Sequence, residues 1–387
     1  MKSRSHISRV VQEIPPSGIR KFFDIVYSMP DCISLGVGEP DFVTPWKISD
    51  SGIYAIKDGY THYTPNRGLP ELRNLIARKI YEDIGVGYSP DEEIIITVGV
   101  SQALDLALRT VLDPGDEIII AEPCYVSYAN NAKLTYAVPV AVPTWDKNEF
   151  QLDPDDLKKA ITPKTKALLL NYPANPTGST LSEPVLREIA KVAIEHDLIV
   201  ISDELYSSII FEGKHFSITQ IPGMRERTIY LNGFSKSHAM TGWRLGYVCG
   251  PKEIISPMLK IHQYTALCAP SMAQYAALEA LENGEFEVEK MRAEYERRCN
   301  YITSRFNEIG IPCRKPKGTF YVFPNITPTG LTSEEFAMKL IEKNRVAVVP
   351  GNVFGASGEG HIRCSFATSI DNLKGALNRI EDFVKNL

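Results

Sequence analysis

Short apolar runs alternate with longer amphipathic stretches through the middle of the chain. Residues 94–98 read Ile-Ile-Ile-Thr-Val and predict a buried strand, and residues 101–111 predict the helix that follows it. Further apolar runs predict strands at 117–121, 165–170, 198–202 and 228–231. Residues 183–196, between the runs at 165–170 and 198–202, have apolar side chains at helical spacing. Strands and helices that alternate in this way predict an α/β fold, with a mainly parallel sheet between helices.

The pattern changes near residue 284. Residues 285–306 predict a long charged helix, and strand-like pieces follow at 318–323 and 345–349 before a closing helix from about residue 371. Near the N-terminus, Ile33-Ser34-Leu35 predicts a lone strand that packs with this tail. We therefore expect a large domain over 45–283, and a smaller α+β domain formed by 1–44 and 284–387.

Composition narrows the class of protein. The 387 residues include 42 Lys and Arg and 47 Asp and Glu, so the net charge is −5, which gives no reason to expect nucleic acid as a partner. The seven cysteines are scattered and contain no C-x-x-C pair, so we expect neither a disulfide framework nor a metal site. No secretory leader and no apolar run of membrane-spanning length is visible, which predicts a cytoplasmic protein.

Residues capable of chemistry follow the predicted strands. Asn175-Pro176-Thr177-Gly178 follows the run that ends at 170, Asp203 follows the run that ends at 202, and Ser235-Lys236 follows the run that ends at 231. Gly99-Val100-Ser101 lies between a predicted strand and its helix, where backbone N–H groups can bind an anion. Because ligands collect beyond the carboxyl ends of parallel strands, this order favours a single site.

Lys236 and Arg244 suggest the chemistry of that site. A lysine that attacks a carbonyl needs a lowered pKa, which nearby positive charge helps to provide, and an arginine with hydroxyl side chains can hold a phosphate. A lysine nucleophile beside a phosphate clamp is typical of enzymes that use pyridoxal phosphate (PLP). Each motif also has an ordinary interpretation by itself: a solvated lysine, a surface ion pair, a turn at 175–178, or a helix cap at Asp203.

The motifs together resemble one enzyme family. The chain is similar to the class I/II aminotransferases of fold-type I, and within them to the prokaryotic and archaeal branch with aspartate and aromatic aminotransferases. The resemblance is carried in family order by six segments: Gly36-Val37-Gly38-Glu39-Pro40-Asp41-Phe42, Tyr63-Thr64-Pro65-Asn66-Arg67-Gly68, Asn175-Pro176-Thr177-Gly178, Ser202-Asp203-Glu204, Ser235 to Arg244, and Arg363-Cys364-Ser365-Phe366-Ala367. It implies a seven-stranded sheet in the large domain, PLP as cofactor and a homodimer with shared sites.

The resemblance also implies roles for single residues. Lys236 would bind PLP covalently and later move the proton at the substrate's Cα, and Asp203 would face the pyridine nitrogen. Asn175 and Tyr206 would donate to the ring's phenolate oxygen, and Tyr125 would stack on the ring. The phosphate would be held by Ser235, Arg244, the backbone at Val100 and Ser101, and Tyr63 of the neighbouring subunit. Arg363 would bind the substrate α-carboxylate beside Gly38.

The chain departs from the family pattern at Gly99-Val100-Ser101. Aspartate-using members of this branch often have Gly-Gly-Lys here, where the lysine helps to bind the distal carboxylate. We therefore expect an aromatic or broadly hydrophobic L-amino acid as donor, with aspartate possible, and a 2-oxo acid such as 2-oxoglutarate as acceptor in a ping-pong reaction. The alternative is a PLP-dependent β-lyase or decarboxylase on the same fold. A PLP-binding transcription regulator fits poorly, because only about forty residues precede the first motif.

Overall fold

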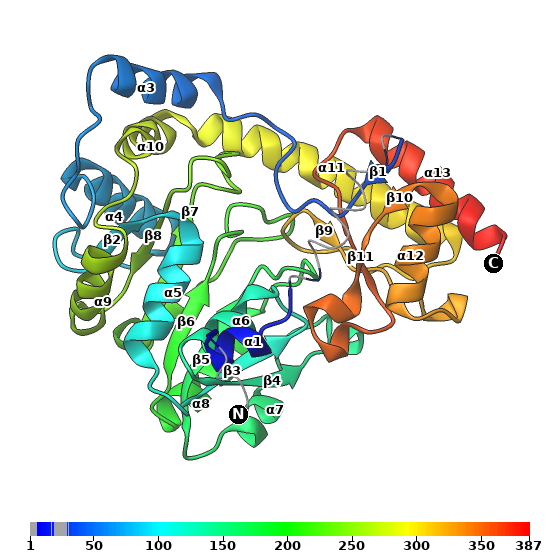
Figure 1. Cartoon of the computed structure of the whole chain (residues 1–387), viewed down its shortest axis with the longest axis horizontal. Coiled ribbons are helices and arrows are strands. Elements are labelled where there is room, and N and C mark those ends of the chain that lie inside the picture. Colours follow the sequence, from blue (N-terminus) through cyan, green and yellow to red (C-terminus); the bar gives the residue numbers. More distant parts are fainter. Residues whose placement is uncertain (1–5, 17, 19–28, 30) are drawn as a thin grey trace.

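A seven-stranded sheet forms the centre of the computed structural model, which describes residues 6–16, 18, 29 and 31–387 (Figure 1). The strand order is β2-β8-β7-β6-β5-β3-β4, and β8 runs antiparallel to both of its neighbours while the remaining pairs are parallel. The strands are β2 (Ile94–Thr97), β3 (Glu117–Glu122), β4 (Val138–Pro143), β5 (Thr165–Asn171), β6 (Ile199–Asp203), β7 (Thr228–Gly233) and β8 (Gly246–Cys249). The expected mainly parallel sheet of an α/β fold is confirmed.

Two strands of this sheet were absent from the sequence prediction. β4 carries prolines at 139 and 143 and lies at the sheet edge, where a missing N–H is tolerated. β8 has four residues and begins at a glycine, so it lacks the apolar run that marks its neighbours. Both strands are therefore recognisable only through their pairing.

Helices cover both faces of the sheet. Alternate residues of the strands pack to opposite sides: Ile118 and Ile120 pack with α5 and α9, whereas Ile119 packs with α8. The helices of this part are α3 (Trp46–Lys57), α4 (Pro70–Ile84), α5 (Gly99–Val111), α6 (Ser127–Leu134), α7 (Pro154–Ala160), α8 (Glu183–Glu195), α9 (Lys252–Thr265) and α10 (Ser271–Asn283). This double cover explains why the strands are apolar throughout.

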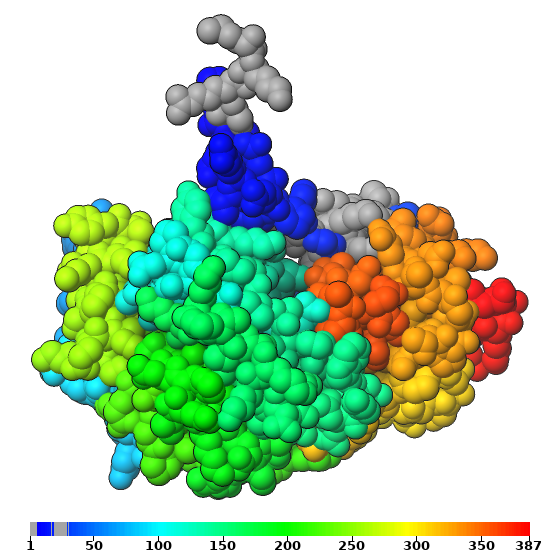
Figure 2. Space-filling model, turned by 90° about the horizontal axis from the view of Figure 1, so that it is seen from below, coloured from blue at the N-terminus to red at the C-terminus, as the bar shows by residue number. Residues whose placement is uncertain are grey.

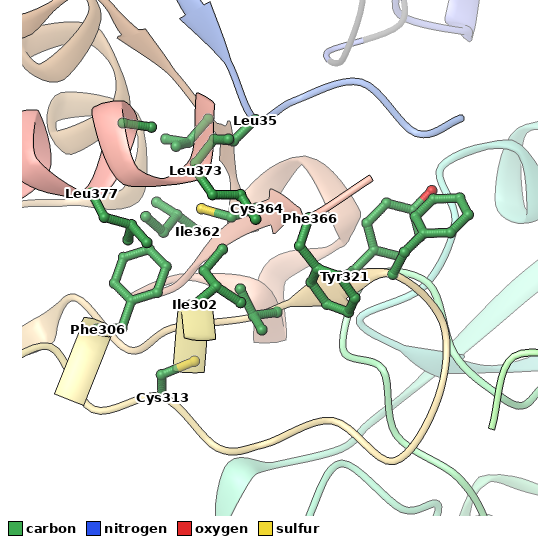
Figure 3. Packing of buried hydrophobic residues seen from close by; sticks show 14 of the residues in the cluster. Leu35, Ile302, Phe306, Cys313, Tyr321, Ile362, Cys364, Phe366, Leu373 and Leu377 are labelled. Atoms are coloured by element: carbon green, nitrogen blue, oxygen red, sulfur yellow. The ribbon is translucent and has the colours of Figure 1, made fainter. Parts of the chain in front are cut away.

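The C-terminal elements enclose a second apolar core (Figure 3). Leu35 from the N-terminal side lies in this core with Phe306, Phe366 and Leu377. The elements are α11 (Glu285–Ile309), β9 (Tyr321–Val322), α12 (Ser333–Asn344), β10 (Val346–Ala347), β11 (Val349–Pro350), β12 (Ile362–Ser365) and α13 (Ile370–Lys385), with β1 (Ile33–Ser34) paired in parallel to β10. The core holds β12 at one end of the main sheet, which brings Arg363 to the cavity described below.

Shorter elements complete the described chain. Short 3-10 helices are η1 (Asp146–Asn148), η2 (Ile218–Gln220), η3 (Arg225–Arg227), η4 (Thr327–Thr329), η5 (Gly351–Phe354) and η6 (Ala356–Gly358). Near the N-terminus, α1 (Arg9–Glu13) stands out from the body of the molecule and buries none of its residues (Figure 2). The domain boundaries at residues 45 and 284 stay a prediction. None of the described helices has the length and apolar character needed to cross a membrane.

Candidate active site

A cavity of about 750 Å³ lies where β5, β6 and β7 end. Because these strands are parallel, Asn171 at the end of β5 pairs directly with Asp203 at the end of β6, and β7 leads into Ser235 and Lys236. The lining includes these residues named from the sequence: Gly38, Val100, Ser101, Tyr125, Asn175, Asp203, Tyr206, Ser235, Lys236, Arg244 and Arg363. The segments predicted to meet at the carboxyl edge of the sheet therefore do meet there.

Lys236 places a basic amine inside the cavity. Its Nζ donates to the carbonyl oxygen of Gly38 at 2.7 Å. Burial lowers the pKa of Lys236 to about 8; the positive charges of Arg363 and Arg244 act in the same direction, and the Glu39 carboxylate opposes them. Near neutral pH a larger fraction of this amine is therefore unprotonated than in an exposed lysine, and the unprotonated amine is the form that attacks as a nucleophile.

Asp203 places a carboxyl group in the lining of the same cavity. The residue is only 6% exposed, and its Oδ2 accepts a hydrogen bond of 2.8 Å from the Tyr128 hydroxyl. Burial raises the pKa of Asp203 to about 6, and the Tyr128 hydrogen bond acts against that rise. A positive charge placed beside this carboxylate would be strongly favoured, because it would relieve the cost of burying the anion.

The start of α5 forms an anion cradle. Gly99 has φ of 69°, and a methyl group added to it would lie 2.7 Å from the Nη2 atom of Arg244. No side chain caps the N-terminus of α5, so its first N–H groups are free to bind an anion, as is typical of helix N-termini. Ser235 and Ser101 line the same cavity. Among the described residues, Arg244 has no carboxylate partner in an ion pair.

Arg363 is a buried cation without a carboxylate partner in the described part of the chain. It is 2% exposed; Nη1 donates to Asn175 Oδ1 at 2.9 Å and Nη2 to the Gly36 carbonyl at 2.7 Å, while Nε has no hydrogen-bond partner. Its guanidinium lies 4.5 Å from the centre of the Tyr321 ring and 4.8 Å from that of Phe354. An unsatisfied charged donor in this setting is costly, which indicates a site for an anion supplied from outside the chain.

Gly38 lies directly in front of Arg363. A methyl group added there would lie 2.7 Å from the Tyr321 hydroxyl and 3.8 Å from Arg363 Nη2. Only glycine leaves this approach open, and the role expected of Gly38 beside the substrate carboxylate stays a prediction.

Three residues that sequence reasoning did not name also line the cavity. Tyr128 donates to Asp203, Asn171 Nδ2 donates to the Asp203 carbonyl at 3.0 Å, and the Tyr321 hydroxyl lies 3.0 Å from that of Tyr206. Asn171 was detectable as the residue that ends β5. Tyr128 and Tyr321 gave no such signal, because their partners are 75 and 115 residues away along the chain.

Tyr63 lies apart from the site. It is 83% exposed and is not among the residues that line the cavity. Tyr125 is partly exposed at the cavity wall, with its ring edge-to-face against Tyr128 at 5.6 Å between ring centres. Within the single chain the structure therefore brings together every predicted site residue except Tyr63.

The donor set fits PLP, the cofactor implied by the resemblance. The cavity offers a lysine amine for the aldehyde, a buried carboxylate for the ring nitrogen, and an uncapped helix N-terminus with Arg244 for the phosphate. The guanidinium group of Arg363, which also lines the cavity, then remains for a carboxylate of the substrate. No group of three or more His, Cys, Asp or Glu side chains in the described chain could hold a metal ion.

Comparisons with known proteins agree with this geometry. Over residues 30–380 the sequence matches the family described as aminotransferase class I and II. It is 50% identical to an aspartate aminotransferase of Pyrococcus abyssi over 96% of each chain, and 46% identical to aromatic-amino-acid aminotransferase 2 of Thermococcus litoralis over 98% of each. The solved structure of an aromatic aminotransferase from Pyrococcus horikoshii matches with a TM-score of 0.91 and 47% identity, covering 94% of this chain and 99% of that one.

These matches extend along almost the whole chain and far exceed what a shared fold alone would produce. They favour transamination over the β-lyase or decarboxylase alternative, because the relatives are named as aminotransferases. The chain belongs to the class I and II aminotransferases, and it is a PLP-dependent transaminase.

Proposed function

We propose that this enzyme transfers the amino group of an L-amino acid with an aromatic or other hydrophobic side chain to a 2-oxo acid such as 2-oxoglutarate, and uses aspartate less well. The observation that carries this proposal is the set of cations around the cavity. Among the described residues that line it, the cationic side chains are Lys236, Arg244 and Arg363. Each of them has a role toward the cofactor or the α-carboxylate, so none of the described cationic side chains of the same chain remains at the cavity for a distal carboxylate.

The residue roles proposed for the reaction follow from the contacts. Arg363 lines the cavity and binds the α-carboxylate through its guanidinium group, and because both half-reactions of a ping-pong transfer use this site, it binds the amino acid and the 2-oxo acid in turn. Asn175 uses its oxygen to accept from Arg363, which leaves its Nδ2 to donate toward the cofactor's phenolate oxygen together with Tyr206. Tyr125 stacks on the ring, and Ser235, Ser101, the Val100 N–H and Arg244 bind the phosphate.

The acid–base chemistry is assigned to Lys236 and Asp203. When bound, PLP supplies an electron-withdrawing ring that stabilises negative charge at the substrate's Cα. Asp203 holds the proton on the pyridine nitrogen, and the buried position of this carboxylate strengthens that interaction. The Lys236 amine removes the proton at the substrate's Cα and delivers it to the C4′ carbon of the cofactor. The lowered pKa of Lys236, about 8, suits this role of base and acid near neutral pH.

The substrate side chain would meet the apolar and aromatic part of the cavity lining. Val37, Leu104, Tyr125 and Val126 are among the lining residues, and Ser101 stands where related aspartate-using enzymes often have a lysine. A distal carboxylate as short as that of aspartate would be buried here without an ion pair from this chain, whereas an aromatic side chain would gain by burial. The longer 2-oxoglutarate would keep its distal carboxylate hydrated nearer the mouth of the cavity. The names of the relatives include both aspartate and aromatic aminotransferases. The preference between aspartate and an aromatic amino acid as amino donor is therefore the property to measure.

A substrate panel with the loaded enzyme tests the proposal. Phenylalanine, tyrosine, leucine and aspartate are each mixed with the protein while the absorbance of the bound cofactor and the formation of glutamate from 2-oxoglutarate are followed. We expect kcat/KM for phenylalanine to exceed that for aspartate by about tenfold or more. Ser101→Lys should raise the value for aspartate, and Ser101→Gln, similar in length but neutral, should not. Equal use of aspartate and phenylalanine by the unmodified enzyme would contradict the proposal.

We further propose a homodimer in which Tyr63 serves the site of the neighbouring subunit. Large apolar side chains are exposed on α3 and the segment that follows: Trp46 is 70% exposed, and Tyr54, Ile56 and Tyr63 are exposed as well. The opposite side of α3 packs on α10 through Ile48, Gly52 and Ala55, so the helix is apolar on both sides. The projecting α1, with Val11 51% exposed, also lacks cover in a single subunit (Figure 2).

Subunit exchange tests the shared site. An inactive Lys236→Ala protein is mixed with an inactive Tyr63→Ala protein and exchange is verified by mass. If Tyr63 acts on the neighbouring subunit, each mixed dimer has one site with both lesions and one with neither, so activity should recover toward half of the unmodified value per dimer. Verified exchange without recovery would mean that Tyr63 serves its own subunit.

A further inference from the structure

Glu204 is a buried carboxylate with its own set of donors outside the cavity. It is 2% exposed, and its Oε1 accepts hydrogen bonds from the hydroxyls of Ser202 at 2.8 Å and Ser217 at 2.7 Å. Its Oε2 makes a close contact with Nε2 of His215, which is itself mostly buried. Glu204 is not among the cavity-lining residues, and the proposed reaction makes no use of it.

The position of Glu204 follows from strand geometry. Its N–H donates to the Leu231 carbonyl at 2.9 Å, so the pairing of β6 with β7 extends one residue beyond Asp203. Because strand side chains alternate, Ser202 and Glu204 point to one face and Asp203 to the other. The hydrogen bond between Ser202 and Glu204 agrees with this alternation. A rotation of the chain at 204 would therefore turn Asp203 away from the cavity.

Glu204 also closes the loop that begins with it. Residues 204–217 leave the sheet and return, and the contacts with His215 and Ser217 join the two ends of this loop. Between these ends the loop carries Tyr206, whose hydroxyl meets that of Tyr321. It also pairs with the chain near residue 318: Phe211 N donates to the Lys317 carbonyl at 2.8 Å, and Thr319 N to the Ile209 carbonyl at 2.9 Å.

We infer that Glu204, clamped by His215 and Ser217, is a positioning residue that holds Asp203 and Tyr206 toward the cofactor. The inference rests on the proposed role of Asp203 in the reaction. A buried carboxylate stays in place only while its donors hold it, and loss of one donor leaves an uncompensated buried charge. The clamp therefore fixes the backbone from which both cofactor-facing side chains project.

Four variants test the clamp, with Asp203→Asn as the reference. His215→Phe removes one donor, and His215→Gln keeps a donor of similar reach. Glu204→Gln keeps the acceptor oxygen for the two serines but loses the charge, and Glu204→Ala is avoided because the chain could fail to fold. Glu212→Gln, an exposed acid on the same loop, is the matched control. Each protein is measured for PLP dissociation constant, for the midpoint pH of the bound cofactor's absorbance and for apoenzyme unfolding in urea.

We expect His215→Phe to raise the PLP dissociation constant by about tenfold, the factor that corresponds to one lost hydrogen bond to a buried charge. Its absorbance midpoint should move in the same direction as that of Asp203→Asn. Glu204→Gln should show the same two changes to a smaller extent. His215→Gln should keep the PLP dissociation constant and the absorbance midpoint close to those of the unmodified enzyme, and Glu212→Gln should leave both unchanged.

The outcomes separate the inference from its premise. His215→Phe and Glu204→Gln could lower only the urea concentration at the midpoint of unfolding and leave the midpoint pH of the cofactor's absorbance unchanged. In that case the contacts of Glu204 only stabilise the fold, and the inference is wrong. If Asp203→Asn itself leaves the absorbance midpoint unchanged, then the proposed role of Asp203 fails, and the inference falls with it.

Discussion

At the scale of single residues, Lys236 is the side chain on which the proposed chemistry depends most directly. It projects into the cavity from the segment after β7, between the positive charges of Arg244 and Arg363 and the negative charge of Glu39. We expect Lys236→Ala to abolish transamination, because no other lysine lines the described cavity to form the bond with PLP or move the proton at Cα. Noncovalent PLP binding should persist, since the phosphate and ring contacts remain. Equilibrium dialysis and a coupled glutamate assay measure the two effects, and transamination at the unmodified rate would refute the assignment.

The lowered pKa of Lys236 also predicts how the stability of the apoenzyme depends on pH. The pKa is about 8 in the folded protein, because burial disfavours the charged form, against 10.5 in an unfolded chain. At pH values between these two pKa values the unfolded chain binds more protons at Lys236 than the folded protein does. The contribution of Lys236 to the free energy of unfolding therefore rises with pH in this range. At about pH 7 the buried charge therefore destabilises the fold. We expect apo Lys236→Met to resist urea better than the unmodified apoenzyme at about pH 7, with a smaller gain at about pH 10. Equal gains at both values would contradict the lowered pKa.

Asp203 is expected to govern turnover. Asp203→Ala removes the carboxylate proposed to keep the pyridine nitrogen protonated, and each 1.36 kcal/mol of lost transition-state stabilisation corresponds to about a tenfold lower rate. We expect kcat to fall by about a hundredfold or more, with the fold intact by circular dichroism. A fall of less than about tenfold would mean that Asp203 acts mainly as a structural cap after β6.

At the scale of elements, the start of α5 combines a backbone requirement with a binding function. Gly99 adopts φ of 69°, a backbone conformation that is strained for residues with a side chain. It also lies against the Arg244 guanidinium, so an added methyl group would clash with Arg244. We expect Gly99→Ala to weaken PLP binding by about tenfold or more, because Arg244 and the first N–H groups of the helix would be displaced.

Gly85 offers a matched control for that substitution. It caps α4 with the same φ of 69°, and no atom lies within 4 Å of an added methyl group. Gly85→Ala should therefore cost about 1 kcal/mol of stability from backbone strain without changing the PLP dissociation constant. If both variants bound PLP equally well, the cradle at α5 would not be the phosphate site.

At the scale of the whole molecule, the exposed apolar side of α3 should decide assembly. We expect Trp46→Lys to shift the protein from dimer to monomer in sedimentation, because a charged side chain in a buried interface loses hydration without a partner. Activity should fall with dissociation if Tyr63 of the neighbouring subunit completes the site. Ile194→Lys, at an exposed position on α8, is the control and should leave the mass unchanged. A Trp46→Lys protein that stays dimeric would locate the interface elsewhere.

The sequence by itself determined the type of fold and the edge of the sheet where the site lies. Apolar runs of strand length alternate with segments whose apolar residues have helical spacing. This pattern can be recognised in each segment from its own residues, without knowledge of its partners in the fold. The carboxyl ends of parallel strands must lie together, so Asp203 and Lys236 could be grouped before any contact was known. Their chemical roles came from residue type and from the family resemblance.

Only the tertiary structure decided how those groups are held and tuned. The hydrogen bond from Tyr128 to Asp203, the unpaired Nε of Arg363 and the clamp of Glu204 by His215 depend on contacts between residues brought together by folding. The strands β4 and β8 likewise became visible through pairing, since a proline-containing edge strand and a four-residue strand carry weak local patterns. Secondary-structure propensity and the spacing of apolar residues act over a few residues along the chain. Burial, charge balance and hydrogen-bond partners are set by the whole packed chain.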